Sequence, residues 1–181
     1  MFTKNFIFKD FIKKKKSKVL MKHLKEIINN KNEIIKSLGN NYKYSYSKNL
    51  IRNLKKHKDF RIFGMGGSSL GANAIYDFLK NKVDKNFYFL SNLNRKTFSN
   101  KKYLNLIISK SGSTLETIVN LNIFIKKKDK NILITENKKN ILRELSQKLK
   151  AEIIDHNNYI GGRYSVLSEV GMLPAELMGL K

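Results

Sequence analysis

The segment Asn105-Leu-Ile-Ile-Ser-Lys-Ser-Gly-Ser-Thr-Leu-Glu-Thr117 shows most directly how this chain folds. Its apolar beginning, together with Leu104, has the pattern of a strand buried on both faces of a parallel sheet. The apolar run ends in four hydroxyl residues around one lysine and one glycine, namely Ser109, Ser111, Ser113 and Thr114. A helical pattern follows, and Ser113 and Glu116 have the spacing of a capping box, which predicts that the helix begins there.

A strand that runs through a hydroxyl-rich turn into a helix N-terminus is suited to binding a phosphate group. The free N–H groups and the positive end of the helix dipole attract an anion, and hydroxyl groups add donors. The alternative is an ordinary strand–helix loop, because Ser, Thr and Gly are common turn and cap residues. One cap residue would suffice for such a loop, whereas four hydroxyls within residues 109–114 favour phosphate binding.

The rest of the sequence alternates short apolar runs with helical patterns. Strands are predicted at residues 60–63, 87–90, 104–108, 132–135 and 152–154. Helices are predicted at residues 19–38, 50–54, 74–79, 114–128 and 138–150, with a last one after residue 166 that Pro174 kinks or restarts. This alternation predicts an α/β three-layer sandwich with a five-stranded parallel sheet, preceded by N-terminal helices. We expect a helical extension at 1–58, a sheet domain at 59–165 and the start of a helical segment at 166–181.

The segment Gly64-Met-Gly-Gly-Ser-Ser-Leu-Gly71 follows the first predicted strand but is not a dinucleotide-binding fingerprint. Ser69 stands where that fingerprint has a glycine or alanine, and the second strand ends in Ser91 and Asn92 instead of an acid. The sequence also has no Gly-Lys-Ser of the nucleotide-binding type. The glycines therefore predict close approach of the backbone to a different ligand, although a purely structural turn is the alternative.

A third glycine cluster, Gly161-Gly-Arg-Tyr-Ser165, follows the fifth predicted strand. Two glycines before Arg163 leave the backbone free to present its guanidinium group, which fits oxyanions. Gly-Gly is also a common turn. Ligands of such sheets bind beyond the carboxyl ends of the strands, where the strand order reverses, and the loops at 64–71 and 109–114 both lie at that edge.

The formal net charge of +23 over 181 residues makes nucleic-acid binding a rival function. However, the lysines are spread over predicted helix faces and loops, with runs only at 13–16 and 126–128, and no arginine cluster accompanies them. We therefore expect a solvated basic surface and no nucleic-acid partner.

Several features that the sequence lacks exclude further classes of protein. No apolar run approaches the ~18 residues of a membrane span, and the N-terminus lacks the pattern of a signal peptide. The chain contains no cysteine, which fits a cytoplasmic protein. Three scattered histidines, at positions 23, 57 and 156, predict no metal site, and His156 is expected to be a satisfied surface residue.

Taken together, the three clusters resemble the glucose-6-phosphate isomerase family, whose N-terminal half is a sugar-isomerase (SIS), flavodoxin-like fold. The matching segments are Gly64-Met-Gly-Gly-Ser-Ser-Leu-Gly71, Ile108-Ser-Lys-Ser-Gly-Ser-Thr-Leu-Glu-Thr117 and Gly161-Gly-Arg-Tyr-Ser-Val-Leu-Ser-Glu-Val-Gly-Met-Leu-Pro174. The resemblance covers about residues 20 to 181. The serine-rich loop is shared across SIS domains, whereas the segment that begins at Gly161 is specific to this isomerase among sugar-phosphate binders.

The resemblance also implies roles for particular residues. The substrate phosphate would be held by Ser109, Lys110, Ser111 and Thr114. The sugar side of the site would be lined by Gly66, Gly67 and Ser68. Arg163 would be catalytic, because its charge would stabilise the enediolate intermediate. Ser69 departs from the acid often found at its position.

The resemblance therefore implies an aldose–ketose isomerase of glycolysis and gluconeogenesis that interconverts glucose 6-phosphate and fructose 6-phosphate. It implies no cofactor and a homodimer for the full-length form. Nothing in this sequence matches the family's glutamate base or its ring-opening histidine and lysine. We expect an N-terminal portion without the C-terminal half, unable to isomerise at an enzyme-like rate alone. The alternative is a non-catalytic SIS-type module that binds a sugar phosphate.

Overall fold

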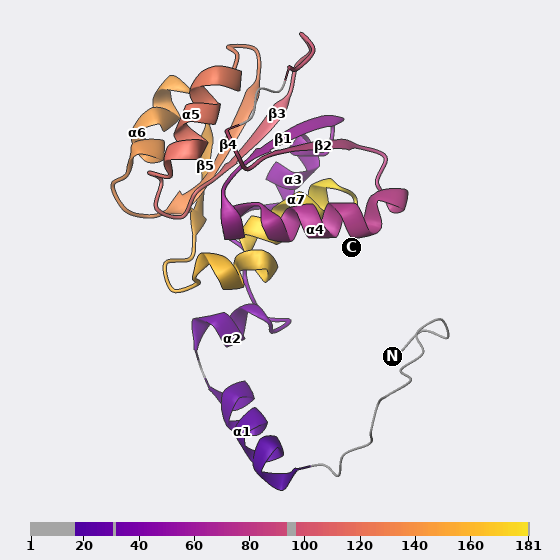
Figure 1. Cartoon of the computed structure of the whole chain (residues 1–181), viewed down its shortest axis with the longest axis vertical. Helices are drawn as coiled ribbons and strands as arrows, with labels where there is room; N and C mark the ends of the chain where they lie inside the picture. Colours follow the sequence, from indigo (N-terminus) through magenta and orange to yellow (C-terminus); the bar gives the residue numbers. More distant parts are fainter. Residues whose placement is uncertain (1–16, 31, 94–96, 181) are drawn as a thin grey trace.

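The computed structural model describes residues 17–30, 32–93 and 97–180, and these residues form a five-stranded parallel sheet (Figure 1). The strands are β1 (Asp59–Phe63), β2 (Asn86–Leu90), β3 (Leu104–Ile108), β4 (Lys130–Glu136) and β5 (Glu152–His156). Every residue of β3 is buried, which explains why its sequence is a nearly continuous apolar run. The α/β fold that the sequence predicts is confirmed.

Helices cover both faces of the sheet (Figure 1). One face carries α3 (Lys48–Leu54), α4 (Leu70–Leu79) and α7 (Glu169–Leu177), and the other carries α5 (Leu115–Phe124) and α6 (Ile141–Lys148). Because successive strand side chains point to opposite faces, Ile62 packs in the first of these cores and Phe63 in the second. The 3-10 helices are η1 (Gly66–Ser68), η2 (Lys80–Lys82) and η3 (Gly162–Leu167).

The strand order β2-β1-β3-β4-β5 determines where loops meet. The chain passes from β1 to β2 on one side and then returns to β3 on the other side of β1, so the order reverses between β1 and β3. These two strands are parallel, with Phe63 opposite Ile107. The loops that follow them, at 64–71 and 109–114, therefore begin side by side at one edge of the sheet.

The first hydrophobic core contains residues from outside the sheet domain that the sequence predicts. Ile51 and Leu54 of α3 and Val170 of α7 belong to the same cluster of buried side chains as Ile62 of β1. The expected boundaries after residues 58 and 165 therefore run through one hydrophobic core. Helix α7 is continuous through Pro174 and does not restart there.

The helix predicted at residues 19–38 is in fact two helices, α1 (Lys18–Asn29) and α2 (Glu33–Ser37). Asparagine side chains compete with the helical backbone for hydrogen bonds, and they do so here. The backbone of Asn30 is extended, and Asn32 Oδ1 accepts from the Ile34 N–H at 2.8 Å, which starts a new helix.

Two further helices are shorter than the sequence predicts. The helix expected at 114–128 ends at Phe124, because the carboxylate of Asp129 accepts from the Lys126 N–H at 3.0 Å and holds the chain in a turn. The helix expected at 138–150 begins at Ile141, because Asn140 Oδ1 caps it by accepting from the Arg143 N–H at 3.0 Å.

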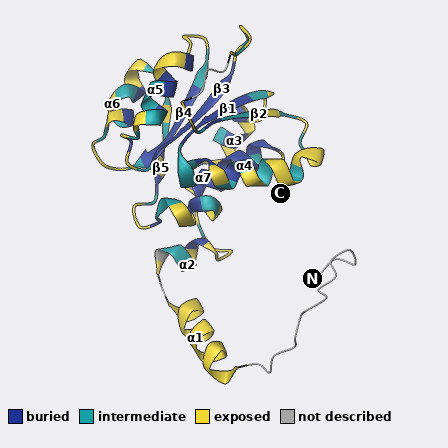
Figure 2. Ribbon diagram, in the orientation of Figure 1, coloured by how far each residue is buried: buried dark blue, intermediate teal, exposed yellow. Residues whose placement is uncertain are grey.

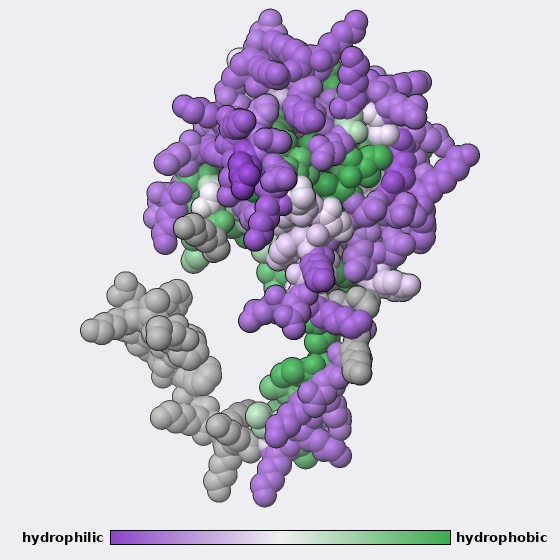
Figure 3. All heavy atoms as spheres, turned by 180° about the vertical axis from the view of Figure 1, so that it is seen from behind, coloured by the Kyte–Doolittle hydropathy of each residue, from purple (hydrophilic) through white to green (hydrophobic). Residues whose placement is uncertain are grey.

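Helix α1 is amphipathic, yet none of its residues is buried (Figure 2). Its side chains Leu20, Ile27 and Ile28 are more than half exposed. Figure 3 shows this hydrophobic side of α1 beside a body that is mostly hydrophilic in that view. Among the described residues, the buried members of both hydrophobic cores begin at Ile51 of α3, and α1 contributes none.

Across the described ranges, none of the helices has the length and apolar character needed to cross a bilayer.

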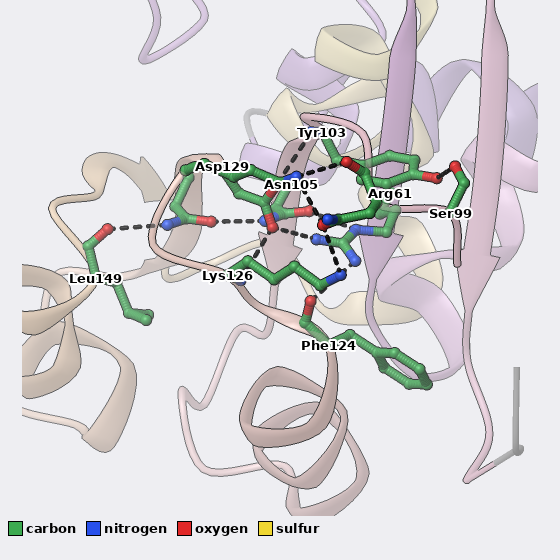
Figure 4. A network of polar contacts seen from close by, with 11 residues as sticks. Arg61, Ser99, Tyr103, Asn105, Phe124, Lys126, Asp129 and Leu149 are labelled. Carbon is green, nitrogen blue, oxygen red and sulfur yellow. Dashed lines mark hydrogen bonds and ion pairs between the residues drawn. The ribbon is translucent and has the colours of Figure 1, made fainter. Parts of the chain in front are cut away.

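A row of polar side chains crosses three adjacent strands inside the second core (Figure 4). Arg61 of β1 lies opposite Asn105 of β3, which lies opposite Asn131 of β4. Arg61 Nε donates to Asn105 Oδ1 at 2.8 Å, and Asn105 Nδ2 donates to Asn131 Oδ1 at 2.7 Å. Asn131 Nδ2 then donates to the carbonyl of Leu149 at 2.9 Å. A shift of any of these strands by one residue would break the row.

The guanidinium group of Arg61 is completely buried and has a partner on every side. It forms an ion pair with Asp129 at 2.5 Å, donates to the carbonyl of Phe124 at 2.9 Å and lies 4.4 Å from the ring centroid of Tyr103. Burial lowers the pKa of Arg61, and the neighbouring Asp129 carboxylate opposes that shift. The pair ties the connection between α5 and β4 to the centre of the sheet.

Removal of the Asp129 carboxylate should therefore be costly. We expect Asp129→Ala to lower the free energy of unfolding by about 3–5 kcal/mol, because it leaves the Arg61 charge buried without its counter-ion. Urea denaturation measures this value. Glu152→Ala is the control, because the Glu152–Lys130 pair is 3.9 Å long and exposed, and its loss should change stability by ~0.5 kcal/mol at most. Equal stabilities of the two variants would contradict a structural role for the buried pair.

Candidate functional site

A cavity of about 290 Å³ opens at the edge of the sheet where β1, β3 and β4 end. Its lining consists of Ser68, Lys110, Ser111, Thr114 and Glu136. The sequence analysis singled out four of these residues, from two different loops, and the strand order brings them to one place. Glu136 is a fifth residue that the sequence analysis missed.

The turn after β3 is held in shape by Ser109. Its hydroxyl is buried, lies 2.9 Å from Thr114 Oγ1 and accepts from the Gly112 N–H at 3.2 Å. Gly112 has a φ of +66°, and a Cβ atom there would lie 2.1 Å from Asn140 Oδ1. The side chain of Ser109 therefore shapes the turn, while Ser111 and Thr114 face the cavity.

The capping box that the sequence predicts at Ser113 is wrong. Thr114 is the N-cap residue of α5, and no side chain caps this helix. Thr114 Oγ1 is already engaged with Ser109, and Ser113 Oγ donates instead to Ser111 Oγ at 3.3 Å. No side chain therefore occupies the first N–H groups of α5, as anion binding at a helix N-terminus requires, and the N-cap residue Thr114 lines the cavity.

Lys110 is held on two sides. Its carbonyl accepts from the Glu136 N–H at 3.1 Å and from Thr135 Oγ1 at 3.2 Å. Its ammonium group donates to the carbonyl of Asn158 at 2.8 Å and forms an ion pair with Glu136 at 3.1 Å. Lys110 therefore contributes a positive charge whose position is fixed from β4 and from the loop after β5.

The carboxylate of Glu136 is largely buried beside two lysines. Burial raises the pKa of Glu136, but hydrogen bonds from Lys110 and Lys138 outweigh burial, and the net shift is downward. The sequence did contain a signal for Glu136, because it directly follows the fourth predicted strand, at residues 132–135, and so lies at the ligand-binding edge. It was missed because an acid is not expected beside a phosphate.

The glycine loop after β1 packs directly on the loop that carries Arg163. A Cβ atom at Gly67 would lie 2.1 Å from the Gly162 carbonyl oxygen, so only glycine permits this approach. Ser165 Oγ donates to the Gly162 carbonyl at 2.7 Å and to the Gly67 carbonyl at 3.4 Å. Gly66 has a φ of +54° and begins η1, which places Ser68 at the cavity.

Arg163 and Ser69 occupy contrasting environments. Arg163 lies in η3 with an exposed side chain, next to the contact between Gly162 and Gly67 but outside the lining of the cavity. Ser69 is fully buried, and its hydroxyl lies 3.1 Å from that of Ser91 at the end of β2. The family that the sequence resembles often has an acid at this position. In this chain, Ser69 instead connects the loop after β1 to the residue that follows β2.

His156 and Glu169 are both buried, and the expectation of a surface histidine is wrong. His156 is the last residue of β5, its Nδ1 lies 2.8 Å from the Asn157 carbonyl, and burial lowers its pKa. The Glu169 carboxylate accepts from the hydroxyl of Tyr42 at 3.1 Å and from both the N–H and the hydroxyl of Ser45. Within the described part of the chain, no cluster of residues suited to hold a metal ion occurs.

Comparisons with known proteins point to one family. A family model described as phosphoglucose isomerase matches residues 12–180. A glucose-6-phosphate isomerase of Methanocaldococcus jannaschii is 34% identical over 151 residues. That match covers 75% of this chain but 37% of the relative, so the chain spans little more than a third of that relative's length.

Solved structures show the same fold. A hypothetical protein from Thermus thermophilus has a TM-score of 0.62 and 25% identity, over 73% of this chain and 37% of that one. A tagatose-6-phosphate ketose/aldose isomerase from Escherichia coli has a TM-score of 0.53 over 70% of this chain and 40% of that one. At 16% identity, the second likeness shows the fold alone.

The contact between the two glycine loops can be tested by adding a methyl group on either side. Gly67→Ala should lower the free energy of unfolding by about 1–3 kcal/mol, because the new Cβ atom meets backbone that must move. Gly162→Ala is the matched control, since a Cβ atom there has nothing within 4 Å and should leave stability nearly unchanged. Chemical denaturation of both variants gives the comparison. A Gly67→Ala protein as stable as the wild type would show that the loops do not pack as described.

Proposed function

Because the chain belongs to the phosphoglucose isomerase family, we propose that its cavity binds the phosphate group of glucose 6-phosphate and fructose 6-phosphate. One observation carries this proposal. Hydroxyl groups from two loops and the ammonium group of Lys110 surround one cavity at the uncapped N-terminus of α5. This combination of donors and positive charge suits a dianion of phosphate size.

Each part of the site has a distinct role in this proposal. Ser111, Thr114 and Ser68 donate hydroxyl hydrogen bonds to the phosphate oxygens, and Lys110 provides charge. Ser109 holds the turn through its bonds to Thr114 and Gly112. The size of the cavity, about 290 Å³, leaves the sugar to extend beyond it. Gly66 and Gly67 lie beside Ser68 in η1 and are proposed to line the sugar.

The proposed reaction moves a proton between C1 and C2 of the sugar through an enediolate. Arg163 is proposed to stabilise the negative charge that develops on the enediolate oxygen, because a guanidinium is always charged and donates a planar pair of hydrogen bonds. The contact between Gly67 and Gly162 supports this role, since it holds the Arg163 loop beside the sugar side of the site. The proposal needs no cofactor, because the carbonyl of the substrate supplies the reactive centre.

Isomerisation also needs a base that removes a proton from carbon. The carboxylate of Glu136 is paired with two lysines, and that of Glu169 is buried against Tyr42 and Ser45. We therefore propose that the base comes from polypeptide corresponding to the part of the relatives that this chain does not match. The complete enzyme, proposed to be a cytoplasmic homodimer, would act in glycolysis and gluconeogenesis.

A second candidate function is a non-catalytic module that binds a sugar phosphate. The paired state of Glu136 favours it, because the one acid among the described residues lining the cavity is not free to act as a base. Both candidates share the phosphate site and differ in whether turnover occurs once the remaining polypeptide of the family is supplied.

The phosphate site itself is tested by removing two hydroxyl groups. Glucose 6-phosphate should raise the melting temperature of the wild type, and the double variant Ser111→Ala, Thr114→Ala should bind it at least tenfold more weakly. A hydrogen bond to a charged group contributes about 1.5–3 kcal/mol, which is roughly tenfold or more in affinity. Thermal shift against ligand concentration gives the affinities.

The control for this test is Ser113→Ala, on the same turn but outside the cavity lining, which should retain binding. Inorganic phosphate should compete with the sugar phosphate, and unphosphorylated glucose should not stabilise the protein. Equal stabilisation of the double variant and the wild type would place the phosphate elsewhere.

A further inference from the structure

Glu136 is the one acid among the described residues that line the proposed phosphate cavity. A carboxylate at this position repels a phosphate dianion and so opposes the binding for which the other lining residues are suited. An acid on the surface would be screened by water, but the side chain of Glu136 is only 13% exposed. The position of this acid in the proposed phosphate cavity therefore needs an explanation.

The backbone of Glu136 is fixed at the end of β4. Its N–H donates to the Lys110 carbonyl at 3.1 Å, and its own carbonyl accepts from Arg143 Nε at 2.7 Å and from Asn140 Nδ2 at 3.4 Å. These bonds hold the backbone of Glu136 in place, so rotation of the side chain is the simplest way for the carboxylate to change its partner.

The side chain of Glu136 is shared between two lysines. Oε1 lies 3.1 Å from Lys110 Nζ, and Oε2 lies 3.3 Å from Lys138 Nζ. Lys138 is 67% exposed and lies outside the cavity lining, so it can follow the carboxylate if the latter turns away from Lys110. Lys110 keeps its bond to the Asn158 carbonyl in either arrangement, because an ammonium group has three N–H donors.

We propose that Glu136 is an internal counter-ion that pairs with Lys110 in the empty cavity and gives up this partner to the ligand phosphate, while Lys138 keeps the carboxylate paired. This inference rests on the proposed function of the cavity as a phosphate site. Glu136 then determines specificity, because only a group with enough negative charge displaces a carboxylate from Lys110. The carboxylate also lowers the affinity for phosphate, since binding has to break one ion pair to form another.

The direct test is Glu136→Gln, which removes the charge and keeps the size of the side chain. We expect this variant to bind inorganic phosphate about 3–10-fold more tightly than the wild type, measured by isothermal titration at constant ionic strength and pH 7.5. Glu144→Gln is the matched control, because it makes the same change of net charge on α6, where Glu144 has only a 4.0 Å contact with Lys139. Its affinity for phosphate should stay within twofold of the wild type.

A second pair of variants tests the role of Lys138. Lys138→Met removes the partner that receives the carboxylate, and we expect phosphate binding to weaken about threefold. Lys139→Met is the neighbouring control, because Lys139 is 91% exposed and lies outside the cavity lining, and it should have little effect. Because Lys138 is exposed, its variant is expected to fold as the wild type does, and circular dichroism checks this for all four variants.

The outcomes separate this inference from the proposed function. If the wild type binds phosphate and Glu136→Gln binds it equally or more weakly, Glu136 is not a competitor and the counter-ion inference is wrong. If neither protein binds phosphate, the proposed function fails and the inference fails with it. Tighter binding by Glu136→Gln, with Glu144→Gln unchanged, supports both.

Discussion

The parallel pairing of β1 with β3 is the constraint on which the site depends. It reverses the strand order at this point and brings the glycine loop after β1 next to the hydroxyl-rich turn after β3. Within the same strands, the polar row that begins at Arg61 fixes the register, because its hydrogen bonds require Arg61, Asn105 and Asn131 to be level. A buried ion pair is poor evidence for stability in itself. Here the buried Arg61, with its ion pair to Asp129 and its hydrogen bond to Asn105, specifies which residues of adjacent strands face each other. The register in turn determines where the loops start.

Much of the fold could be predicted because its signals are local. The run from Leu104 to Ile108 is apolar throughout except at Asn105 because a central parallel strand is buried on both faces, and the structure places β3 there. The position of the serine-rich turn at the sheet edge follows from the same pattern. Helix ends were harder to predict, because they depend on which partner a polar side chain chooses. Thr114 engages its hydroxyl with Ser109, and Asn32 starts a helix inside a continuous helical pattern.

Other features depend on contacts between residues that are distant in sequence, and no local sequence pattern predicts such contacts. Arg61 is a charge in the middle of a strand, and its burial becomes favourable only because Asp129, far along the chain, returns to meet it. The same holds for Glu169, whose carboxylate is satisfied by Tyr42 and Ser45 from the connection between α2 and α3. Glu136 was missed for a chemical reason, because reasoning from ligand charge selects cations and donors and overlooks an acid that moderates them.

The central claim is that the phosphate binds at the turn after β3. A rival position exists in a second cavity of about 500 Å³, whose lining includes Asp129 and four lysines, Lys126, Lys127, Lys148 and Lys150. The lysines would attract anions by their charge. Amide chemical shifts of the isotope-labelled protein during titration with glucose 6-phosphate distinguish the two. Our account predicts saturable shifts centred on residues 110–116 and Ser68. Shifts centred on residues 126–127 and 148–150, with the turn after β3 unchanged, would contradict it.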